Sequence, residues 1–347
     1  MPGLDRRALL AGGLAVLAGC NAPVPSSTPP PTPAASTPTP TATPTLTPTV
    51  VPPHEDVAVM TYNILSGTRT ASDFNRRAPA VPVHFGNRLP VLAEWIKDAD
   101  PEILAVQENE PMRRPVRLPL RALLPELPKF SAVHAESDVP ILFRKGRFAV
   151  KSSGIRTIST AHLRRFCSWA VLTSSESGRD ILVANTHLDP GMNHRMDVIR
   201  KASLRVITDL LTRLNPSGDI PVLLLGDFNA HTHRGGADPT TTVFEPLVRM
   251  GLVNSWEIAQ ADLTAVPLAA TLNGLGTEVR GRWTYGALRH DGYTIDYVWC
   301  GPGITVRDWQ VFTGPRTREI DGFPFFADGP IPSDHCPILA KVGIPLS

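Results

Sequence analysis

The chain has 347 residues, of which 42% are hydrophobic and 19% are charged. This balance is typical of a soluble globular protein with enough apolar side chains for a sizeable core. The formal net charge of +2 creates no global basic field, so the composition gives no sign of a general nucleic-acid binder.

Residues 1–20 have the pattern of an export signal. Arg6 and Arg7 precede an apolar run over residues 8–17, and Leu17-Ala18-Gly19-Cys20 follows. This tetrapeptide resembles a bacterial lipobox, so we expect Cys20 to be lipidated and to anchor the protein to a membrane, facing outside the cytoplasm. An ordinary signal peptide and a twin-arginine signal are the alternatives. The apolar run is too short to span a membrane comfortably.

Residues 21–53 contain 12 prolines, 12 serines or threonines and no charged residue. Such a segment has almost nothing apolar to bury, which predicts a disordered, extended tether. The remaining residues, 54–347, then form one predicted catalytic domain, because no second low-complexity boundary or internal repeat interrupts them.

Three cysteines remain in this domain: Cys167, Cys300 and Cys336. Outside the cytoplasm two of them could form a disulfide, and we expect Cys300 to pair with Cys336 because both lie near strand ends. Their spacing shows no zinc pattern.

The first part of the domain alternates strands and helices. An apolar run at 57–64 predicts a strand that carries Asn63 near its end. Apolar residues at the i, i+3, i+4 and i+7 positions predict a helix over 87–97. A second buried strand at 102–108 ends in Gln107 and Glu108, and a short helix is expected at 118–124.

The middle of the chain predicts strand pairs. Residues 139–144 and 148–150 are typical of a hairpin around Lys145-Gly146. Residues 168–173 and 180–186 form a second predicted pair, which ends at His187. A helix is expected over 198–214, where Asn215-Pro216 ends it.

The last part of the domain contains the stretch with the strongest signal. Val222 to Leu225 form a continuous apolar run, typical of a buried strand, and Asp227 and Asn229 follow it. An extended backbone would send these two side chains to the same face. Further strands are expected at 293–299, which contains Asp296, and at 336–342, directly after Ser333-Asp334-His335. Two face-to-face sheets with helices outside accommodate this pattern best.

Polar side chains therefore gather at strand ends, and their types suit phosphoester hydrolysis. Glu108, helped by Asn63, could hold a hard divalent cation such as Mg²⁺ or Mn²⁺. His335 could take a proton from water while Asp296 orients it. Asp227 could position that water or protonate the leaving oxygen. The side chains expected to donate hydrogen bonds to the phosphoryl group are those of Asn229 and His187.

Six short motifs, in this order, resemble the endonuclease/exonuclease/phosphatase superfamily, which has the DNase I-like fold. They are Thr61-Tyr62-Asn63-Ile64, Gln107-Glu108, Asn185-Thr186-His187-Leu188, Gly226-Asp227-Phe228-Asn229, Ile295-Asp296-Tyr297-Val298 and Ser333-Asp334-His335-Cys336-Pro337. The resemblance implies an α/β fold, a four-layer α/β sandwich with two packed, mainly antiparallel β-sheets flanked by helices. It also implies a Mg²⁺- or Mn²⁺-dependent hydrolase.

The resemblance assigns a role to each motif. It implies that Glu108 is the metal ligand with Asn63 beside it, and that Asp334 lies near the metal or the catalytic histidine. It implies that His335 and Asp296 act as a pair. The residues it places at the phosphate are Asp227, Asn229 and His187. Phe143-Arg144 stands where related sequences often have Tyr-Arg, which argues against an abasic-site nuclease.

The substrate stays open at this point. The leading hypothesis is a tethered, monomeric phosphodiesterase or phosphomonoesterase that acts on nucleic acid, a phospholipid head group or a small phosphate ester. An extracellular nuclease would use arginines near the cleft; the candidates are Arg113, Arg114, Arg117, Arg121, Arg164 and Arg165. A sphingomyelinase-type lipid phosphodiesterase would expose Phe323-Pro324-Phe325-Phe326. A non-catalytic binding lipoprotein on the same scaffold is the third alternative.

Overall fold

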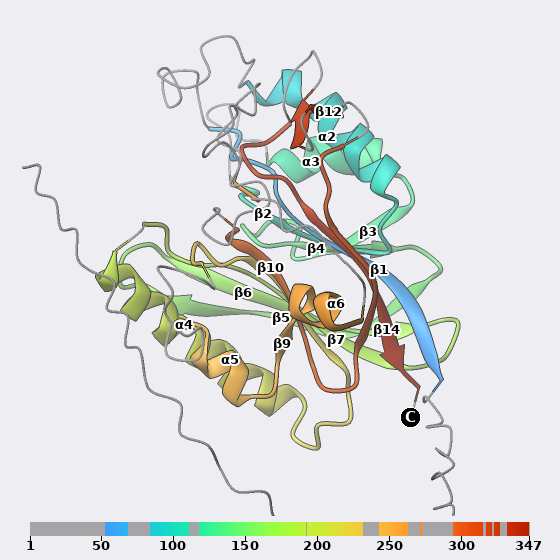
Figure 1. Cartoon of the computed structure of the whole chain (residues 1–347), viewed down its shortest axis with the longest axis vertical. Coiled ribbons are helices and arrows are strands. Elements are labelled where there is room, and N and C mark those ends of the chain that lie inside the picture. The colour runs from blue at the N-terminus through green and yellow to red at the C-terminus, as the bar shows by residue number, and fades with distance from the viewer. Residues whose placement is uncertain are drawn as a thin grey trace, which may run out of the picture. The chain divides into compact units, whose positions relative to one another are not determined.

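Two six-stranded β-sheets form the centre of the structure (Figure 1). The computed structural model describes residues 53–68, 84–110, 118–191, 193–231, 243–262, 271–272, 294–314, 317–320, 323–326 and 332–346. The predicted signal segment with Cys20 and the predicted tether up to residue 52 lie outside these ranges. Val51–Ser347 form one compact unit, which contains both sheets.

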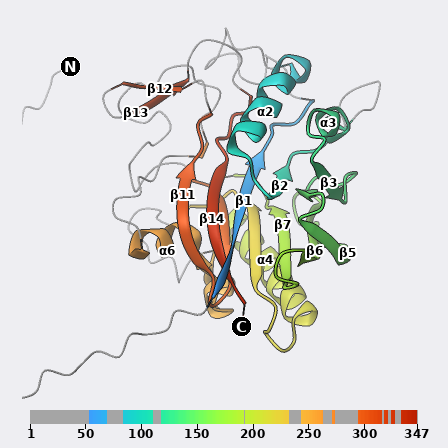
Figure 2. The ribbon, with the colours of Figure 1, turned by 90° about the vertical axis from the view of Figure 1, so that its right-hand side faces the viewer.

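The first sheet has the strand order β11-β14-β1-β2-β4-β3 (Figure 2). Its strands are β1 (His54–Asn63), β2 (Ile103–Gln107), β3 (Phe130–Val133), β4 (Ile141–Arg144), β11 (Thr305–Val311) and β14 (Ile338–Pro345). Neighbours run antiparallel except for β1 and β2, which are parallel. The parallel pair brings the ends of β1 and β2 to the same edge of the sheet, with Asn63 opposite Gln107.

The second sheet has the order β5-β6-β7-β8-β10-β9. Its strands are β5 (Phe148–Ser159), β6 (Arg165–Ser174), β7 (Asp180–His187), β8 (Val222–Asp227), β9 (Val253–Asn254) and β10 (Asp296–Cys300). Again one pair, β7 and β8, is parallel and the other neighbours are antiparallel. The two sheets are therefore mainly antiparallel, as the resemblance implies.

Three apolar layers hold the sheets and helices together. The layer between the sheets contains inward-facing side chains of both, such as Val59 of β1 and Leu225 of β8. The outer face of the first sheet packs against α2 (Phe85–Ala99) and α3 (Pro119–Leu123), which η1 (Leu124–Glu126) extends. The outer face of the second sheet packs against α4 (His194–Leu214) and α5 (Glu245–Arg249) (Figure 1). The predicted four-layer α/β sandwich is confirmed.

Side-chain caps set the ends of the two long helices. His84 accepts a hydrogen bond from the Gly86 amide before α2, and the left-handed Asp100 ends that helix. Asn193 accepts from the Met196 amide before α4. Asn215 ends α4 as predicted, and its side chain bonds the backbone of Ile220 on the way to β8. These caps satisfy backbone groups that a helix leaves unpaired at its ends.

The predicted hairpin around Lys145-Gly146 is wrong. β4 pairs with β2 and β3 in the first sheet, whereas β5 pairs with β6 in the second. The turn between them passes the chain from one sheet to the other, and Phe143 and Phe148 on either side both enter the layer between the sheets. A turn signal between two apolar runs does not distinguish these outcomes, because local geometry does not say which strand each run will pair with.

The expected disulfide is also wrong, since Cys167, Cys300 and Cys336 are free and buried. Cys336 directly follows His335, which contacts Asp296 at the start of β10. Cys300 lies four residues farther along β10, which is about 13 Å of extended chain. A disulfide requires Cα atoms within about 7 Å, so this placement does not suit a bridge between the two thiols.

The other elements lie at the margin of the sheets. α6 (Ser255–Asp262) packs Trp256 and Ile258 against the layer between them. β12 (Thr317–Ile320) and β13 (Phe323–Phe326) form an antiparallel pair. None of the helices in the described ranges is long and apolar enough to cross a membrane.

Candidate active site

The strand register brings the predicted site residues to one end of the sandwich. Asp227, the last residue of β8, lies between His187 at the end of β7 and Asp296 at the start of β10, and is the register partner of both. β10 runs opposite to β8, so its first residue meets the last residue of β8. His335, just before β14, reaches the same end from the first sheet.

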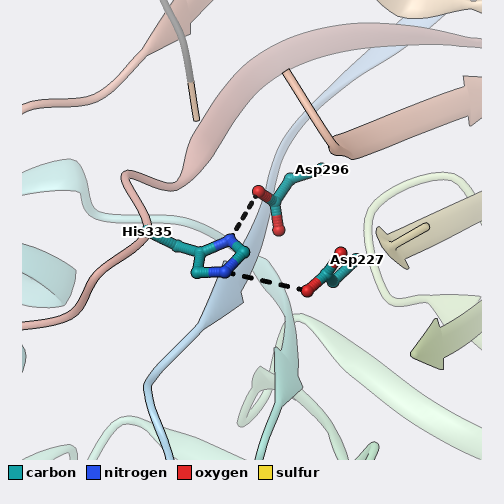
Figure 3. Close-up of side chains that lie close together, drawn as sticks. All are labelled: Asp227, Asp296 and His335. Atoms are coloured by element: carbon teal, nitrogen blue, oxygen red, sulfur yellow. Dashed lines mark hydrogen bonds and ion pairs between the residues drawn. The ribbon is translucent and has the colours of Figure 1, made fainter. Parts of the chain in front are cut away.

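His335, Asp296 and Asp227 form the centre of this group (Figure 3). Nδ1 of His335 lies 2.8 Å from Oδ2 of Asp296, and its Nε2 lies 3.8 Å from Oδ2 of Asp227. Burial alone would lower the pKa of His335, but the charges of Asp296 and Asp227 outweigh it and raise that pKa well above the usual value. The imidazole is therefore oriented by one carboxylate and can exchange a proton at its other nitrogen.

These three residues also offer ligand atoms that all lie within 4.8 Å of one another, so they could hold a metal ion. The direct contact between His335 and Asp296 already occupies one imidazole nitrogen and one carboxylate oxygen. A histidine bonded in this way serves proton transfer better than it serves a hard cation such as Mg²⁺, which prefers oxygen ligands.

Asn63 connects the two sheets at the site. Its Nδ2 donates to Oδ2 of Asp227 at 3.0 Å and to Oε1 of Glu108 at 3.2 Å. Its Oδ1 accepts a hydrogen bond from the backbone amide of Leu65. The amide thus presents its nitrogen, and not its oxygen, to the two carboxylates, and it fixes the position of Glu108 relative to Asp227.

Glu108 is held in a strained conformation. Its backbone is left-handed, with φ of 62°, which a residue with a long side chain seldom adopts. Oε2 accepts from the Ser66 amide at 2.7 Å while Oε1 accepts from Asn63. Each oxygen keeps a further lone pair, so the carboxylate is positioned and still able to bind a cation.

Asp334 adds another carboxylate close to Glu108. Burial raises the pKa of Asp334 to about 6, and the negative charge of Glu108 contributes to that shift. A divalent cation between carboxylates of this kind would remove their mutual repulsion. The residues present therefore suit a hard cation bound through oxygen.

Arg88 was not predicted and is fully buried beside this group. Its guanidinium donates to the carbonyls of Ile64, Leu65 and Pro332, at 2.7 to 2.9 Å. It thereby joins the loop after Asn63 to the segment before Asp334 and His335. The sequence does hold a signal, because Arg88 shares a helix face with Leu92 and Ile96 at spacings of four residues, where an apolar side chain is expected.

His187 belongs to a second pair that the sequence analysis missed. Its Nδ1 lies 3.3 Å from Oδ2 of Asp138 and 3.1 Å from Nη1 of Arg165, while its Nε2 lies 3.6 Å from Oδ2 of Asp227. Burial and Arg165 act to lower the pKa of His187, but Asp138 and Asp227 raise it overall. Asp138 directly precedes the predicted strand at 139–144, so the rule that polar residues gather at strand ends could have found it.

Asn229 does not have the extended backbone that the sequence analysis expected. Its φ of 50° is left-handed, its amide donates to Oδ1 of Asp227, and its Nδ2 donates to the carbonyl of Leu188. The chain turns immediately after β8, so the alternation of side chains along a strand no longer applies. Asn229 lies next to Asp227 but is held toward the end of β7.

The sequence predicts two features that would select a substrate, a group of arginines and a phenylalanine-rich segment. Of the predicted arginines, Arg113, Arg114 and Arg117 lie outside the described residues. Arg121 forms an ion pair with Glu136 at 2.9 Å, and Arg164 lies over the ring of Phe166. For the phenylalanine-rich segment, the backbone forms β13.

Comparisons with known proteins identify one family and several solved structures with a similar fold. A model of the Endonuclease/Exonuclease/phosphatase family matches residues 60–335, a range that includes every predicted catalytic and metal-binding residue. Among curated proteins, none matches the sequence.

Solved structures share the fold at low sequence identity. One is a mannosyl-6-phosphatase from Bacteroides thetaiotaomicron, with a TM-score of 0.60 and 19% identity, where the match covers 82% of this chain and 99% of the other. Another is the catalytic domain of human Nocturnin with a bound sulfate anion, with a TM-score of 0.57, 19% identity and coverage of 84% and 96%. A third is TDP2 from D. rerio with a single-stranded DNA product, with a TM-score of 0.56, 16% identity and coverage of 83% and 98%.

Proposed function

Because the chain belongs to the endonuclease/exonuclease/phosphatase family, we propose that it is a divalent-metal-dependent phosphoesterase. The observation that carries the proposal is the contact between His335 and Asp296, next to Asp227 in a buried group. An oriented imidazole beside a second carboxylate is the arrangement needed to move a proton during hydrolysis.

The proposed cation is Mg²⁺ or Mn²⁺, and Glu108 and Asp334 are the side chains that would hold it. When bound, such an ion neutralises charge on the phosphate oxygens. Asn63 contributes by holding Glu108 at a fixed distance from Asp227 through its two hydrogen bonds. The left-handed backbone of Glu108 supports this role, because strain of this kind is concentrated at functional sites.

The remaining residues act on water and the phosphoryl group. His335 removes a proton at Nε2, and Asp296 stabilises the imidazolium through Nδ1. Asp227 positions the water or protonates the leaving oxygen. Asp138 and Asp227 raise the pKa of His187 against burial and Arg165, which favours the form that can donate a hydrogen bond to a phosphoryl oxygen. Asn229 holds Asp227 through its backbone amide, and one amide hydrogen of its side chain stays available to the phosphoryl group.

The names of the similar structures support phosphoester chemistry without choosing one substrate. They include a phosphatase for a mannosyl phosphate and a protein with a single-stranded DNA product. A nuclease stays an alternative, although Arg121, one of its candidate arginines, is paired with Glu136. A sphingomyelinase-type lipid phosphodiesterase stays a prediction. A non-catalytic binding lipoprotein is disfavoured because every predicted catalytic side chain is present in the sequence.

We propose further that the enzyme works outside the cytoplasm, anchored through Cys20 and extended from the membrane by residues 21–53. The support is the lipobox-like sequence and the proline-rich composition alone. Mass spectrometry of the N-terminal peptide from membranes tests this proposal. A diacylated Cys20 is expected, and an N-terminus without lipid would contradict it.

A panel of phosphoesters tests the proposed activity. The purified full-length chain should hydrolyse at least one activated phosphodiester or phosphomonoester with Mg²⁺ or Mn²⁺ present, and EDTA should stop the reaction. Binding of the same esters to the chain is measured in EDTA, where the reaction should stop, so that binding is separated from hydrolysis. Binding without turnover under either metal would favour the non-catalytic alternative.

A further inference from the structure

A pocket of about 730 Å³ lies next to the proposed catalytic group. Asp138 and Arg165 line it, and both contact Nδ1 of His187. The other nitrogen of His187 lies 3.6 Å from Asp227, so one imidazole ring separates the pocket from the carboxylate at the proposed phosphate position. The pocket is therefore placed to hold the group that is esterified to the phosphate.

One side of the pocket is apolar and comes from the β5–β6 hairpin. Ile155 and Leu163 line it and are 44% and 41% exposed, which is high for large apolar side chains. Phe166 lies beside them, and the guanidinium of Arg164 lies 5.3 Å from the centre of its ring. A flat group that packs here would cover apolar surface that otherwise faces water.

The opposite side is polar and preformed. It consists of Glu110 and the loop from His134 to Asp138. The buried side chain of Asn109 donates to the carbonyls of Ala135 and Ser137, both at 2.8 Å, and accepts from the Leu120 amide. The loop is thus fixed before any ligand binds, which reduces the entropy lost on binding.

Three residues of the pocket each hold a buried polar atom without a hydrogen-bond partner among the described residues. These atoms are Nε2 of His134, Oδ1 of Asp138 and Nε of Arg165. Such atoms are uncommon in folded proteins, because an unpaired buried polar group is costly. These atoms are closed to solvent, so the polar character of the ligand follows from the charged side chains that line the pocket, those of Glu110, Glu136 and Arg164.

We propose that this pocket binds the hydroxyl-bearing ring of a small phosphate ester, as in a sugar phosphate or a nucleotide. The inference rests on the proposed function and specifies its substrate class. The flat side of the ring packs on Phe166, and the ring hydroxyls donate to Glu110 and Glu136.

The charges of the pocket disfavour two other ligands. An acyl chain would desolvate its many ionisable side chains without giving them partners. A nucleic-acid strand would bring further phosphates toward three carboxylates, whereas nucleic-acid sites present excess positive charge. The carboxylates are those of Glu110, Glu136 and Asp138. Arg164 and Arg165 line the same pocket and Arg121 pairs with Glu136, so these side chains give no excess of positive charge.

Matched phosphate esters test the proposal on the purified full-length chain with Mg²⁺ or Mn²⁺. Glucose 6-phosphate, ribose 5-phosphate and adenosine 5′-monophosphate are compared with methyl phosphate, each as the monoester and as its methyl diester. We expect kcat/KM for at least one ring-bearing ester to exceed that for its methyl counterpart by about tenfold or more. Phe166→Ala and Glu110→Gln should lower this ratio by about fivefold or more. The exposed Glu126→Gln serves as the control and should keep the wild-type ratio.

The outcomes separate this inference from the proposed function. Equal rates on ring-bearing and methyl esters, or an unchanged ratio in both pocket variants, would overturn the pocket assignment and leave the phosphoesterase intact. Faster cleavage of a single-stranded oligonucleotide than of any ring-bearing ester would also overturn it. If no ester is hydrolysed, the proposed function fails instead. Calorimetry then tests the pocket assignment with glucose 6-phosphate, ribose 5-phosphate and adenosine 5′-monophosphate. The assignment is wrong if none of these esters binds, or if Phe166→Ala binds each of them as tightly as the wild type.

Discussion

Nδ1 of His335 lies 2.8 Å from Oδ2 of Asp296, and this contact joins the two sheets. His335 precedes β14 of the first sheet, whereas Asp296 begins β10 of the second. The hydrogen bond from Asn63 of β1 to Asp227 of β8 makes a second such connection. The geometry of the site therefore depends on how the sheets pack, so changes in the layer between them should affect activity.

Asp296→Asn should lower kcat by about 10²- to 10⁴-fold, because an amide neither orients His335 correctly nor stabilises its protonated form. Steady-state kinetics on the best ester of the panel measures this. Asp308→Asn, an exposed position on β11, is the matched control and should keep wild-type kcat.

The pH profile gives an independent check of the same pair. His335 must be neutral to accept a proton, and its pKa is raised above 6.5 mainly by Asp296. Activity should therefore rise with pH through a value above 6.5, and Asp296→Asn should move that limb to lower pH. An acid limb at the same pH in both proteins would contradict the assignment of His335 as the base.

Asp138→Asn should destabilise the fold most at mildly acidic pH. Burial acts to raise the pKa of Asp138, but His187 and Arg165 lower it overall. The carboxylate therefore stabilises the fold above its unfolded pKa, and this stabilisation disappears as the pH falls through the folded pKa. The pKa of His187 is raised in the folded state. The imidazolium therefore stabilises the fold below its unfolded pKa, and this stabilisation disappears as the pH rises through the folded pKa. Both contributions are complete between about pH 4 and 6.5.

Urea denaturation of wild type and Asp138→Asn across pH measures this effect. We expect the difference in the free energy of unfolding to be about 1–3 kcal/mol near pH 5.5 and to shrink toward pH 9, where only the contact with Arg165 persists. A difference that stays constant from pH 5 to 9 would show that His187 is not charged in the folded state.

Glu108→Gln should weaken metal binding. The variant keeps the shape of the side chain and its hydrogen bond from Ser66. It loses the charge that attracts the cation, and its NH2 group cannot accept the hydrogen bond from Asn63. The concentration of Mg²⁺ that gives half-maximal activity should rise by at least about tenfold. Thermal stabilisation by Mn²⁺ without substrate should fall in parallel. Glu126→Gln should match wild type in both measurements. If Glu108→Gln showed the same metal dependence as wild type, other side chains would have to hold the cation.

Gly226→Ala should be strongly destabilising. At this position φ is 152°, and a Cβ would lie 2.1 Å from the carbonyl oxygen of Thr186 on the neighbouring strand. The parallel pair of β7 and β8 must separate to admit the methyl group, which we expect to cost roughly 3 kcal/mol or more. Gly86→Ala is the control, because Gly86 lies in the first turn of α2 with ordinary van der Waals space. Urea denaturation that gives both variants the same stability would contradict this account.

The sequence was sufficient to predict the strands that carry the site and the end at which they gather. Apolar runs such as residues 222–225 are long enough to identify buried strands, and the polar residue after each run marks its end. Which strands pair is decided by contacts far apart in the chain, and the passage from β4 to β5 between sheets could not be read from its local turn.

The supporting residues of the site were harder to predict for a different reason. Asp138 and Arg88 act through partners that lie 49 and 244 residues away, so no local pattern connects them to His187 or Pro332. The conformation of Asn229 depends on a hydrogen bond to Leu188 across the β7–β8 pair. A short motif states which side chains are present but not which direction each one faces.

The most direct test of the central claim compares wild type with His335→Ala on bis(p-nitrophenyl) phosphate and p-nitrophenyl phosphate, with Mg²⁺, Mn²⁺ or EDTA. Thermal stabilisation by Mn²⁺ shows whether the variant still binds the cation. The account predicts metal-dependent hydrolysis by wild type and a loss of about 10²- to 10⁴-fold in kcat for a variant that still binds metal. Hydrolysis that persists in EDTA, or an undiminished kcat in His335→Ala, would contradict it.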